Sequence, residues 1–158
     1  MLAASEMIFL TVPFGQALEA VESCTPFLTS NHIVIDVTVP MVFHKGHAEY
    51  LEQAGLSGAE VIASQMPQNV ALVAAFKTIP AAVLMDMETE LNCDVLVCSN
   101  VEEASRKVMD LAATIPSLRP INGGPLKTAR TLERMTVLAV ELNRRYKQKG
   151  ARFRIEGL

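Results

Sequence analysis

Short apolar stretches with almost no polar residue inside them constrain the fold of this chain most. Four of them, residues 7–12, 33–37, 70–76 and 94–98, are nearly continuous rather than alternating. This pattern is typical of strands that are covered on both faces, as in a parallel sheet. Parallel strands need long crossovers between them, and the intervening segments are long enough to contain helices. The sequence therefore predicts an α/β fold.

Helical signals lie between the predicted strands. Residues 15–28 carry apolar side chains at helical spacing, and Ser57 with Glu60 forms a capping-box pattern that opens a helix ending near Met66. Strand and helix therefore alternate along the chain. Because crossovers between parallel strands are right-handed, this alternation predicts a doubly wound, mostly parallel sheet.

The second half of the chain predicts two longer helices. Asn100 and Glu103 open the first, whose apolar residues follow helical spacing as far as Ile115. The second begins after Pro125, because proline suits the first turn of a helix, and it continues to about Lys147. The predicted fold thus ends on a long C-terminal helix.

The remaining segments carry weaker signals. Residues 153–155 alternate enough to predict a short edge strand, while residues 44–55 mix glycine, histidine and charge, as a mobile loop or a short helix does. No internal repeat, low-complexity tract or linker interrupts the sequence. We expect a single domain over residues 1–158 with a doubly wound, mostly parallel sheet.

Composition narrows the possible partners. The formal net charge is -3, so the chain lacks the basic surface that nucleic acids and anionic membranes require. Three cysteines with no C-x-x-C spacing indicate a reducing, cytoplasmic environment. No apolar run approaches the length of a membrane span. We therefore expect a cytoplasmic protein whose partners are small molecules, with no nucleic acid and no membrane among them.

Turns that contain proline or glycine follow the apolar runs. They cover residues 11–15, 39–41, 77–80 and 122–125. Ligands of open α/β sheets bind beyond the carboxyl ends of the strands, so these turns predict one shared crevice. The sequence contains no G-x-G-x-x-G loop, which usually opens a dinucleotide-binding fold.

Several of these turns belong to longer motifs. Residues 78–82 read T-I-P-A-A, and residues 118–130 read L-R-P-x-x-x-G-P-L-x-x-x-R. With F-G-Q-A at 14–17, in this order and spacing, they resemble the NADPH-dependent reductases of the deazaflavin coenzyme F-420 over essentially the whole chain. The resemblance implies a Rossmann-like reductase domain that lacks the two N-terminal βα units carrying the Gly-rich loop in that family.

The resemblance also implies a reaction and two cofactors, NADP and coenzyme F-420. A hydride would pass directly between the nicotinamide and the deazaflavin ring. The protein would stack the two rings and exclude water, so we expect no catalytic acid or base. The cofactor-binding residues implied by the resemblance are Thr11, Val12 and Pro13 beside the nicotinamide, Val39 and Pro40 on the floor, Thr78, Ile79 and Pro80 beside the deazaflavin, and Lys77, Arg130 and Thr136 around the deazaflavin and its charged tail.

Charge on the last helix gives a further expectation. Lys77, Lys127, Arg130 and Arg134 would gather near one end of this helix and favour an anion, although each of them is equally consistent with a solvated surface charge. Any single proline turn is also consistent with a simple strand end, so the site prediction depends on the order of several turns together.

Two alternatives remain open at this point. The chain is either an active reductase or a catalytically silent fragment or assembly module that does not bind NADP by itself. In either case the strand at 7–12 would lie at the edge of the sheet without its usual neighbour. We therefore expect a homodimer or larger homo-oligomer, formed through this edge or through the last helix.

One motif suggests a different chemistry. His44, His47 and Glu49 form an H-x-x-H-x-E pattern that could bind a metal ion. The pattern lacks a fourth ligand and a recognisable rigid scaffold, both of which closed metal sites have. We therefore expect no metal site.

Overall fold

The computed structural model describes residues 5–158 except residue 87. Five strands form the central sheet in the order β1-β2-β5-β6-β7. Their bounds are β1 (Met7–Leu10), β2 (Ile33–Asp36), β5 (Ala71–Ala74), β6 (Cys93–Ser99) and β7 (Leu118–Gly124). The predicted α/β class and the mostly parallel sheet are confirmed, since every pairing is parallel except that of β5 with β6.

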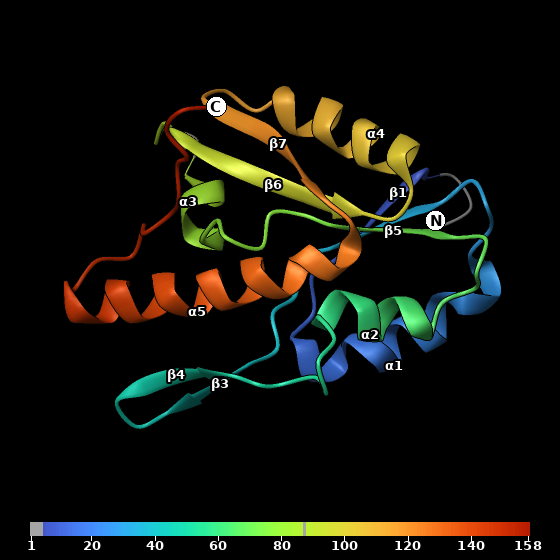
Figure 1. Ribbon diagram of the computed structural model, residues 1–158, viewed down its shortest axis with the longest axis horizontal. Coiled ribbons are helices and arrows are strands. Elements are labelled where there is room, and N and C mark those ends of the chain that lie inside the picture. Colours follow the sequence, from blue (N-terminus) through green and yellow to red (C-terminus); the bar gives the residue numbers. More distant parts are fainter. Residues whose placement is uncertain (1–4, 87) are drawn as a thin grey trace.

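The antiparallel step between β5 and β6 gives the sheet an unusual layout. These strands overlap only near their carboxyl ends, where Val73 pairs with Ser99 and Ala74 with Cys98. Strands β1, β2 and β5 therefore enter from one side of the molecule, and β6 and β7 enter from the other (Figure 1). As a result, the carboxyl ends of all five strands converge near the middle of the sheet.

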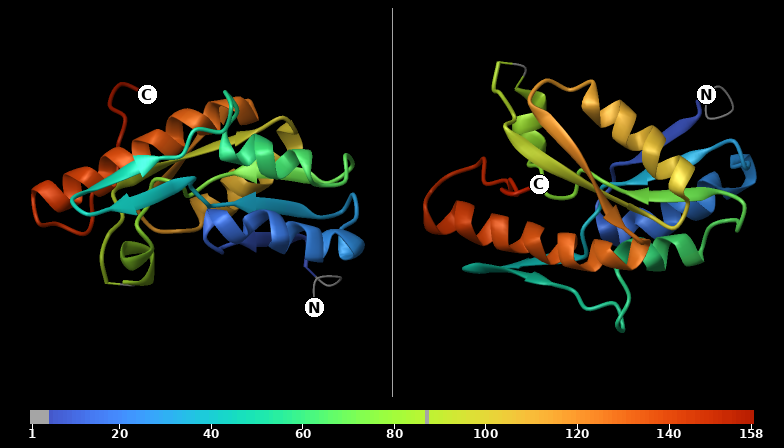
Figure 2. Two further views of the ribbon diagram at one scale, coloured as in Figure 1. Left: turned by 90° about the horizontal axis from the view of Figure 1, so that it is seen from below. Right: turned by 45° about the horizontal axis from the view of Figure 1, so that its top comes forward.

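Helices cover both faces of the sheet (Figures 1 and 2). On one face lie α1 (Phe14–Cys24), α2 (Gly58–Ser64) and α5 (Ala129–Arg145), and on the other lie α3 (Ala81–Met85) and α4 (Glu102–Ala113). Short 3-10 turns, Thr25–Phe27 and Leu126–Thr128, extend α1 and precede α5. Each face has its own apolar core, because strands buried on both sides send alternate side chains to opposite layers.

The predicted helices are confirmed, with differences at their ends. Ser57 and Glu60 form both hydrogen bonds of the capping box at the start of α2. Asn100 does not cap α4, because its side-chain oxygen instead accepts a hydrogen bond from the backbone N–H of Leu126 at 3.0 Å. Asn100 thus ties the end of β6 to the segment that leads into α5. Not every apolar residue at helical spacing in residues 15–28 is buried, since Leu18 of α1 is 39% exposed.

Three segments differ from the sequence-based prediction. Residues 44–55 are not a loop or short helix but contain much of a β-hairpin, β3 (Met41–His44) and β4 (His47–Tyr50), which lies along α5. Residues 153–155 are not a strand. Their backbone is instead held by Asp94, whose N–H donates to Phe153 and whose carboxylate accepts from the N–H of Ile155 at 2.6 Å. β7 was not predicted as a strand, because proline and glycine interrupt its sequence.

Strand β1 lies at the edge of the sheet, as predicted. Its outer side has no neighbouring strand among the described residues, and Phe9 is 43% exposed. Unpaired backbone groups at such an edge favour pairing with another chain. Self-association through β1 stays a prediction.

Close packing of β7 against β6 predicts a specific sensitivity. A Cβ atom at Gly123 would lie 2.5 Å from the Sγ atom of Cys98, which is itself fully buried. We expect Gly123→Ala to lower the free energy of unfolding by about 1–3 kcal/mol through overpacking. Gly15→Ala is the control, because nothing lies within 4 Å of its Cβ position and it is in a helix, where alanine is favoured by up to about 1 kcal/mol. Urea unfolding measures both, and equal stabilities would contradict the packing of β7 on β6.

Candidate functional site

An apolar pocket of about 530 Å³ opens at the carboxyl ends of the three parallel strands. Thr11 follows β1, Val37 follows β2, and Phe76 and Ile79 follow β5. Leu111 of α4 also lines it. In open α/β sheets ligands bind at this end of the strands, so the pocket is the candidate functional site.

A second pocket, of about 560 Å³, lies at the opposite end of the same strands. It is lined by polar residues such as Thr29 and by Lys107, which forms ion pairs with Glu6 and Glu103. The amino ends of parallel strands are not the usual ligand-binding edge of this architecture. We therefore assign the site to the apolar pocket, although the two pockets are similar in volume.

Backbone strain supports this assignment. Phe76 has a φ of 58°, a left-handed conformation that is rare for a bulky side chain. Such conformations cost about 1–3 kcal/mol and are concentrated at functional sites. Phe76 lies where the chain leaves β5 and forms part of the pocket wall. The centroid of its ring lies 6.0 Å from the centroid of the Phe9 ring.

A buried ionic network lies behind the pocket wall. The side chain of Lys77 is fully buried, and its Nζ atom lies 2.7 Å from Asp36, 3.3 Å from Glu133 and 2.5 Å from the carbonyl oxygen of Thr38. The Asp36 carboxylate also accepts two hydrogen bonds from Thr38, one from its backbone N–H and one from the Thr38 hydroxyl. Charged groups this deeply buried must be paired, because water cannot solvate them.

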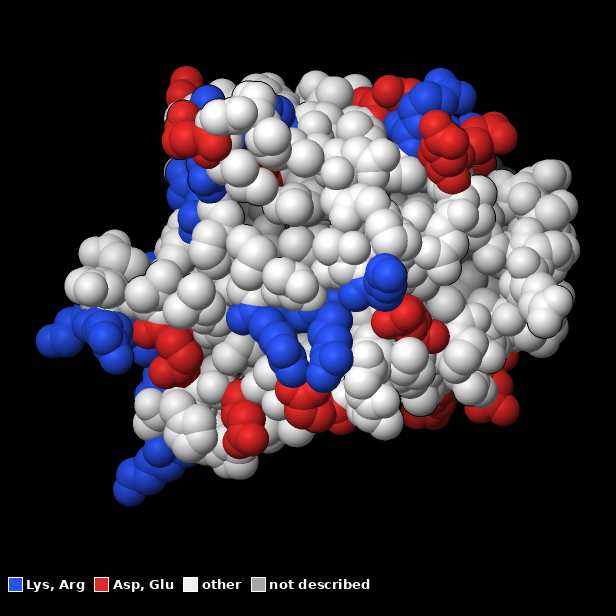
Figure 3. Space-filling model, in the orientation of Figure 1, with Lys and Arg blue, Asp and Glu red and all other residues white. Residues whose placement is uncertain are grey.

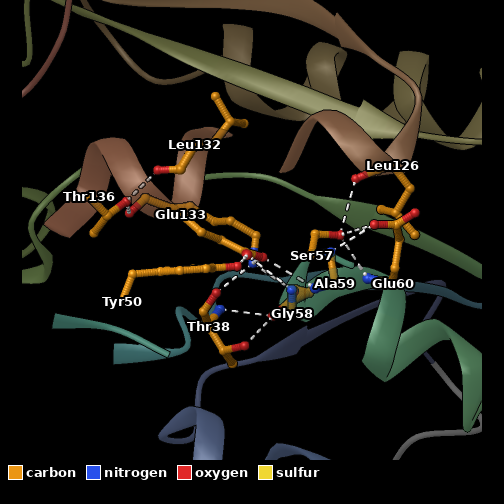
Figure 4. A network of polar contacts seen from close by, with 12 residues as sticks. Thr38, Tyr50, Ser57, Gly58, Ala59, Glu60, Leu126, Leu132, Glu133 and Thr136 are labelled. Carbon is orange, nitrogen blue, oxygen red and sulfur yellow. Dashed lines mark hydrogen bonds and ion pairs between the residues drawn. The ribbon is translucent and has the colours of Figure 1, made fainter. Parts of the chain in front are cut away.

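Glu133 of α5 connects this network to two other segments (Figure 4). It accepts hydrogen bonds from the Tyr50 hydroxyl at 2.8 Å and from the N–H groups of Gly58 and Ala59 at 3.0 and 3.2 Å. Burial and the neighbouring Glu133 carboxylate raise the pKa of Tyr50, so its hydroxyl stays protonated and remains a donor. One carboxylate thus holds the hairpin, the start of α2 and the Lys77 turn together.

The predicted site residues are only partly brought together. Thr11, Lys77 and Ile79 line the pocket, but the ammonium group of Lys77 is engaged with carboxylates and not free for a ligand. Thr78 is buried in the same turn, and Pro80 is the N-cap residue of α3.

Four further predicted residues lie outside the pocket wall. Val12 packs into the core on the α1 side of the sheet, and Pro13 is the exposed N-cap residue of α1. Val39 is half-buried, and Pro40 is fully buried, against Gly58. None of these four residues is among those that line the pocket.

The polar residues of the last helix point to different partners. Arg130 donates to the carboxylate of Glu52 at 2.7 Å and to the carbonyl of Gly55 at 3.1 Å, and Arg134 also contacts Glu52. Thr136 instead donates to the carbonyl of Lys77 at 2.8 Å. Six residues of helix separate Arg130 from Thr136, so the two side chains lie on different faces.

Figure 3 shows basic side chains gathered near the start of α5, with acidic side chains directly beside them. The predicted anion-binding cluster is wrong for Lys77, because that side chain is buried among carboxylates. For Arg130 and Arg134, Glu52 neutralises part of the local charge, and the two guanidinium groups lower the pKa of that carboxyl.

Sequence reasoning did not identify Asp36, Tyr50 and Glu133 as members of the site. Asp36 ends a strand that is otherwise apolar, and Glu133 follows the buried Leu132 in the last helix. A carboxylate at a buried position needs a cationic partner, so an acidic residue within an apolar pattern was the sequence signal for this network. The partner itself could not be identified, because Lys77 is 41 residues from Asp36.

The cysteines provide a test of core packing near the site. Burial raises the pKa of Cys98 to about 11 and also raises that of Cys93, whereas Cys24 is only half-buried. At pH ~8 a thiol with such a pKa has only ~0.1% thiolate, which is the reactive form. We expect an aromatic disulfide reagent to modify Cys24 alone in the native protein and all three cysteines in denaturant. Fast native labelling of a second thiol would contradict this core.

The chain is similar to known reductases over nearly its whole length. No known family model matches the chain. The F-420-dependent NADP reductase of Methanocaldococcus jannaschii is 33% identical over 155 residues, which are 97% of this chain and 69% of that protein. The F-420-dependent NADP reductase of Methanothermobacter marburgensis is 32% identical over 157 residues, covering 98% of this chain and 70% of that protein.

Solved structures confirm the Rossmann-like fold. A crystal structure from Arthrobacter sp. FB24, assigned as an F-420-dependent NADP reductase, matches 98% of this chain and 71% of its own with a TM-score of 0.86 and 20% identity. Pyrroline carboxylate reductase of Plasmodium falciparum with NADP bound matches 77% of this chain and 38% of its own, with a TM-score of 0.51 and 14% identity. At these identities the two structures establish the fold alone.

None of the described helices is both long and apolar enough to span a membrane.

Proposed function

Because this chain belongs to the family of F-420-dependent NADP reductases, we propose that it transfers a hydride between NADP(H) and coenzyme F-420. Curated relatives that carry this name are 31–33% identical to it over nearly its whole length. The proposed enzyme is an oxidoreductase, and its cofactors are those in the name of its relatives.

The apolar pocket at the carboxyl ends of β1, β2 and β5 is the observation that carries this proposal. Flat aromatic rings bind in clefts lined by apolar and aromatic side chains, and the pocket presents Phe9, Phe76 and Ile79. The deazaflavin accepts or donates the hydride, while the protein has to hold the ring and keep water away. The pocket can do both without a catalytic acid or base.

We assign the individual residues accordingly. Thr11 and Ile79 contact the rings from two sides of the pocket, and Thr78 and Pro80 shape the turn beside Ile79. Thr136 positions this turn through the carbonyl of Lys77, and the Lys77 ammonium anchors it to Asp36 and Glu133. Lys77 is thus a positioning residue in this proposal, not a contact for the charged tail of the coenzyme.

The activity is tested by mixing the chain with reduced NADP and oxidised coenzyme F-420 and following the visible absorbance of the deazaflavin. We expect the absorbance to fall at a rate proportional to protein concentration. No change in absorbance, with a relative of full length active beside it, would reject the proposed activity for this chain.

A second candidate, a chain that holds the deazaflavin but not NADP by itself, is favoured by one observation. The sequence contains no G-x-G-x-x-G loop, the segment whose backbone N–H groups bind the pyrophosphate of a dinucleotide. Calorimetry with NADP and coenzyme F-420 in separate titrations separates the two: binding of both supports the reductase, and binding of the deazaflavin alone supports the second candidate.

A further inference from the structure

The β3–β4 hairpin places three metal-ligating side chains on one face. His44 and His47 are paired directly across the strands, and Glu49 lies two residues after His47, so its side chain leaves the strand on the same side. The two imidazole rings stack with their centroids 4.9 Å apart, and His44 Nε2 lies 3.3 Å from a carboxylate oxygen of Glu49. One ligand atom from each of the three lies within 4.8 Å of the others.

From this arrangement we infer a binding site for one borderline divalent transition-metal ion, and we take zinc as its occupant. The inference is independent of the proposed reductase activity. Two imidazole nitrogens and one carboxylate oxygen form a ligand set that suits zinc, copper or nickel and not magnesium or calcium, which prefer oxygen ligands alone.

The distances fit this ion with little movement. Zinc lies about 2.0–2.2 Å from nitrogen and oxygen ligands in a tetrahedron, which places two ligand atoms about 3.3–3.6 Å apart. The separation of 3.3 Å between His44 and Glu49 already matches one edge of that tetrahedron. All three side chains are exposed, so a rotation of His47 can bring in the third ligand and water can complete the fourth position.

The other face of the hairpin supplies the rigid scaffold that the sequence pattern did not reveal. Ala48 is buried, and its N–H donates to Glu141 of α5 at 2.5 Å. Tyr50 donates to Glu133, deep in the ionic network. The tight turn is completed by Gly46, whose φ of 106° belongs to a region that glycine occupies without strain. The hairpin is therefore fixed to α5 through β4, while the ligands His44 of β3 and His47 and Glu49 of β4 are exposed to solvent.

Zinc binding by the untagged, metal-free full chain tests this site. Calorimetric titration with zinc chloride should give one ion per chain. His44→Ala and His47→Ala should each weaken binding by more than about 10-fold, because losing even an outer-shell partner of a metal ligand costs about 10–100-fold. Glu19→Gln is the matched control, since it removes an exposed carboxylate from α1, and it should leave zinc affinity unchanged.

Cobalt distinguishes this site from a cysteine site. Substitution with Co²⁺ should produce visible absorption of a nitrogen- and oxygen-bound ion without a thiolate charge-transfer band, and Cys24→Ser should leave it unchanged. Three results would each overturn the inference: zinc affinity that survives both histidine substitutions, a stoichiometry of one ion per two chains, or a thiolate band that disappears with Cys24→Ser. Equal melting temperatures of the metal-free variants exclude misfolding as the cause of lost binding.

Discussion

Replacing Glu133 by alanine is expected to lower the free energy of unfolding by about 3–5 kcal/mol, the usual cost of removing one partner from a buried ion pair. Glu133 is fully buried, and the substitution leaves Lys77 with one carboxylate in place of two. The N–H groups of Gly58 and Ala59 also lose their acceptor at the start of α2. Urea unfolding should show a lower midpoint with an unchanged slope, because the surface exposed on unfolding is similar.

Glu52→Ala is the control for this experiment. Glu52 is also a carboxylate bonded to two cationic side chains, Arg130 and Arg134, but it lies at the surface. Exposed ion pairs contribute little to stability, so we expect the unfolding midpoint to change far less. If the two substitutions had equal effects, the buried network around Glu133 would not be a major source of stability. Glu133→Gln should fall between them, since an amide keeps one acceptor.

Filling the pocket is expected to abolish its function. Ala81 lines the pocket at the first residue of α3, and its side chain is exposed, so a tryptophan can be accommodated without disrupting the core. We expect Ala81→Trp to reduce the kcat/KM for coenzyme F-420 by more than about 100-fold, because displacing a reacting ring by even 1 Å costs about that much. Titration of the oxidised deazaflavin should show a parallel loss of affinity.

Ala82→Trp provides a closely matched control. Ala82 is also exposed and is the next residue of the same helix, but it does not line the pocket. Both substitutions carry the same small penalty in helix propensity, of about 0.7 kcal/mol or less. An unchanged kcat/KM in Ala81→Trp, or an equal loss in both variants, would show that the deazaflavin binds elsewhere.

Features that depend on residues close in sequence were predicted, and features that depend on distant residues were not. A capping box indicated α2. Apolar spacing indicated α1 and α4, because one face of a helix is buried by residues three and four apart. The hairpin at β3–β4 was missed because its strands lie outside the main sheet, and only one face of the ribbon packs on α5. Its sequence therefore lacks the apolar run that identified β2 and β5.

The sequence alone determined the α/β class, the position of most helices and strands, and the motifs that resemble this family of reductases, because these depend on local spacing and on residue order. Only the tertiary structure decided that β5 and β6 pair antiparallel and that Lys77 forms ion pairs with Asp36 and Glu133. It also decided that the side chains of His44, His47 and Glu49 lie together on one face of the hairpin. Each of these depends on contacts between distant residues. Their energies come from burial and charge pairing, which are set only when the chain has folded.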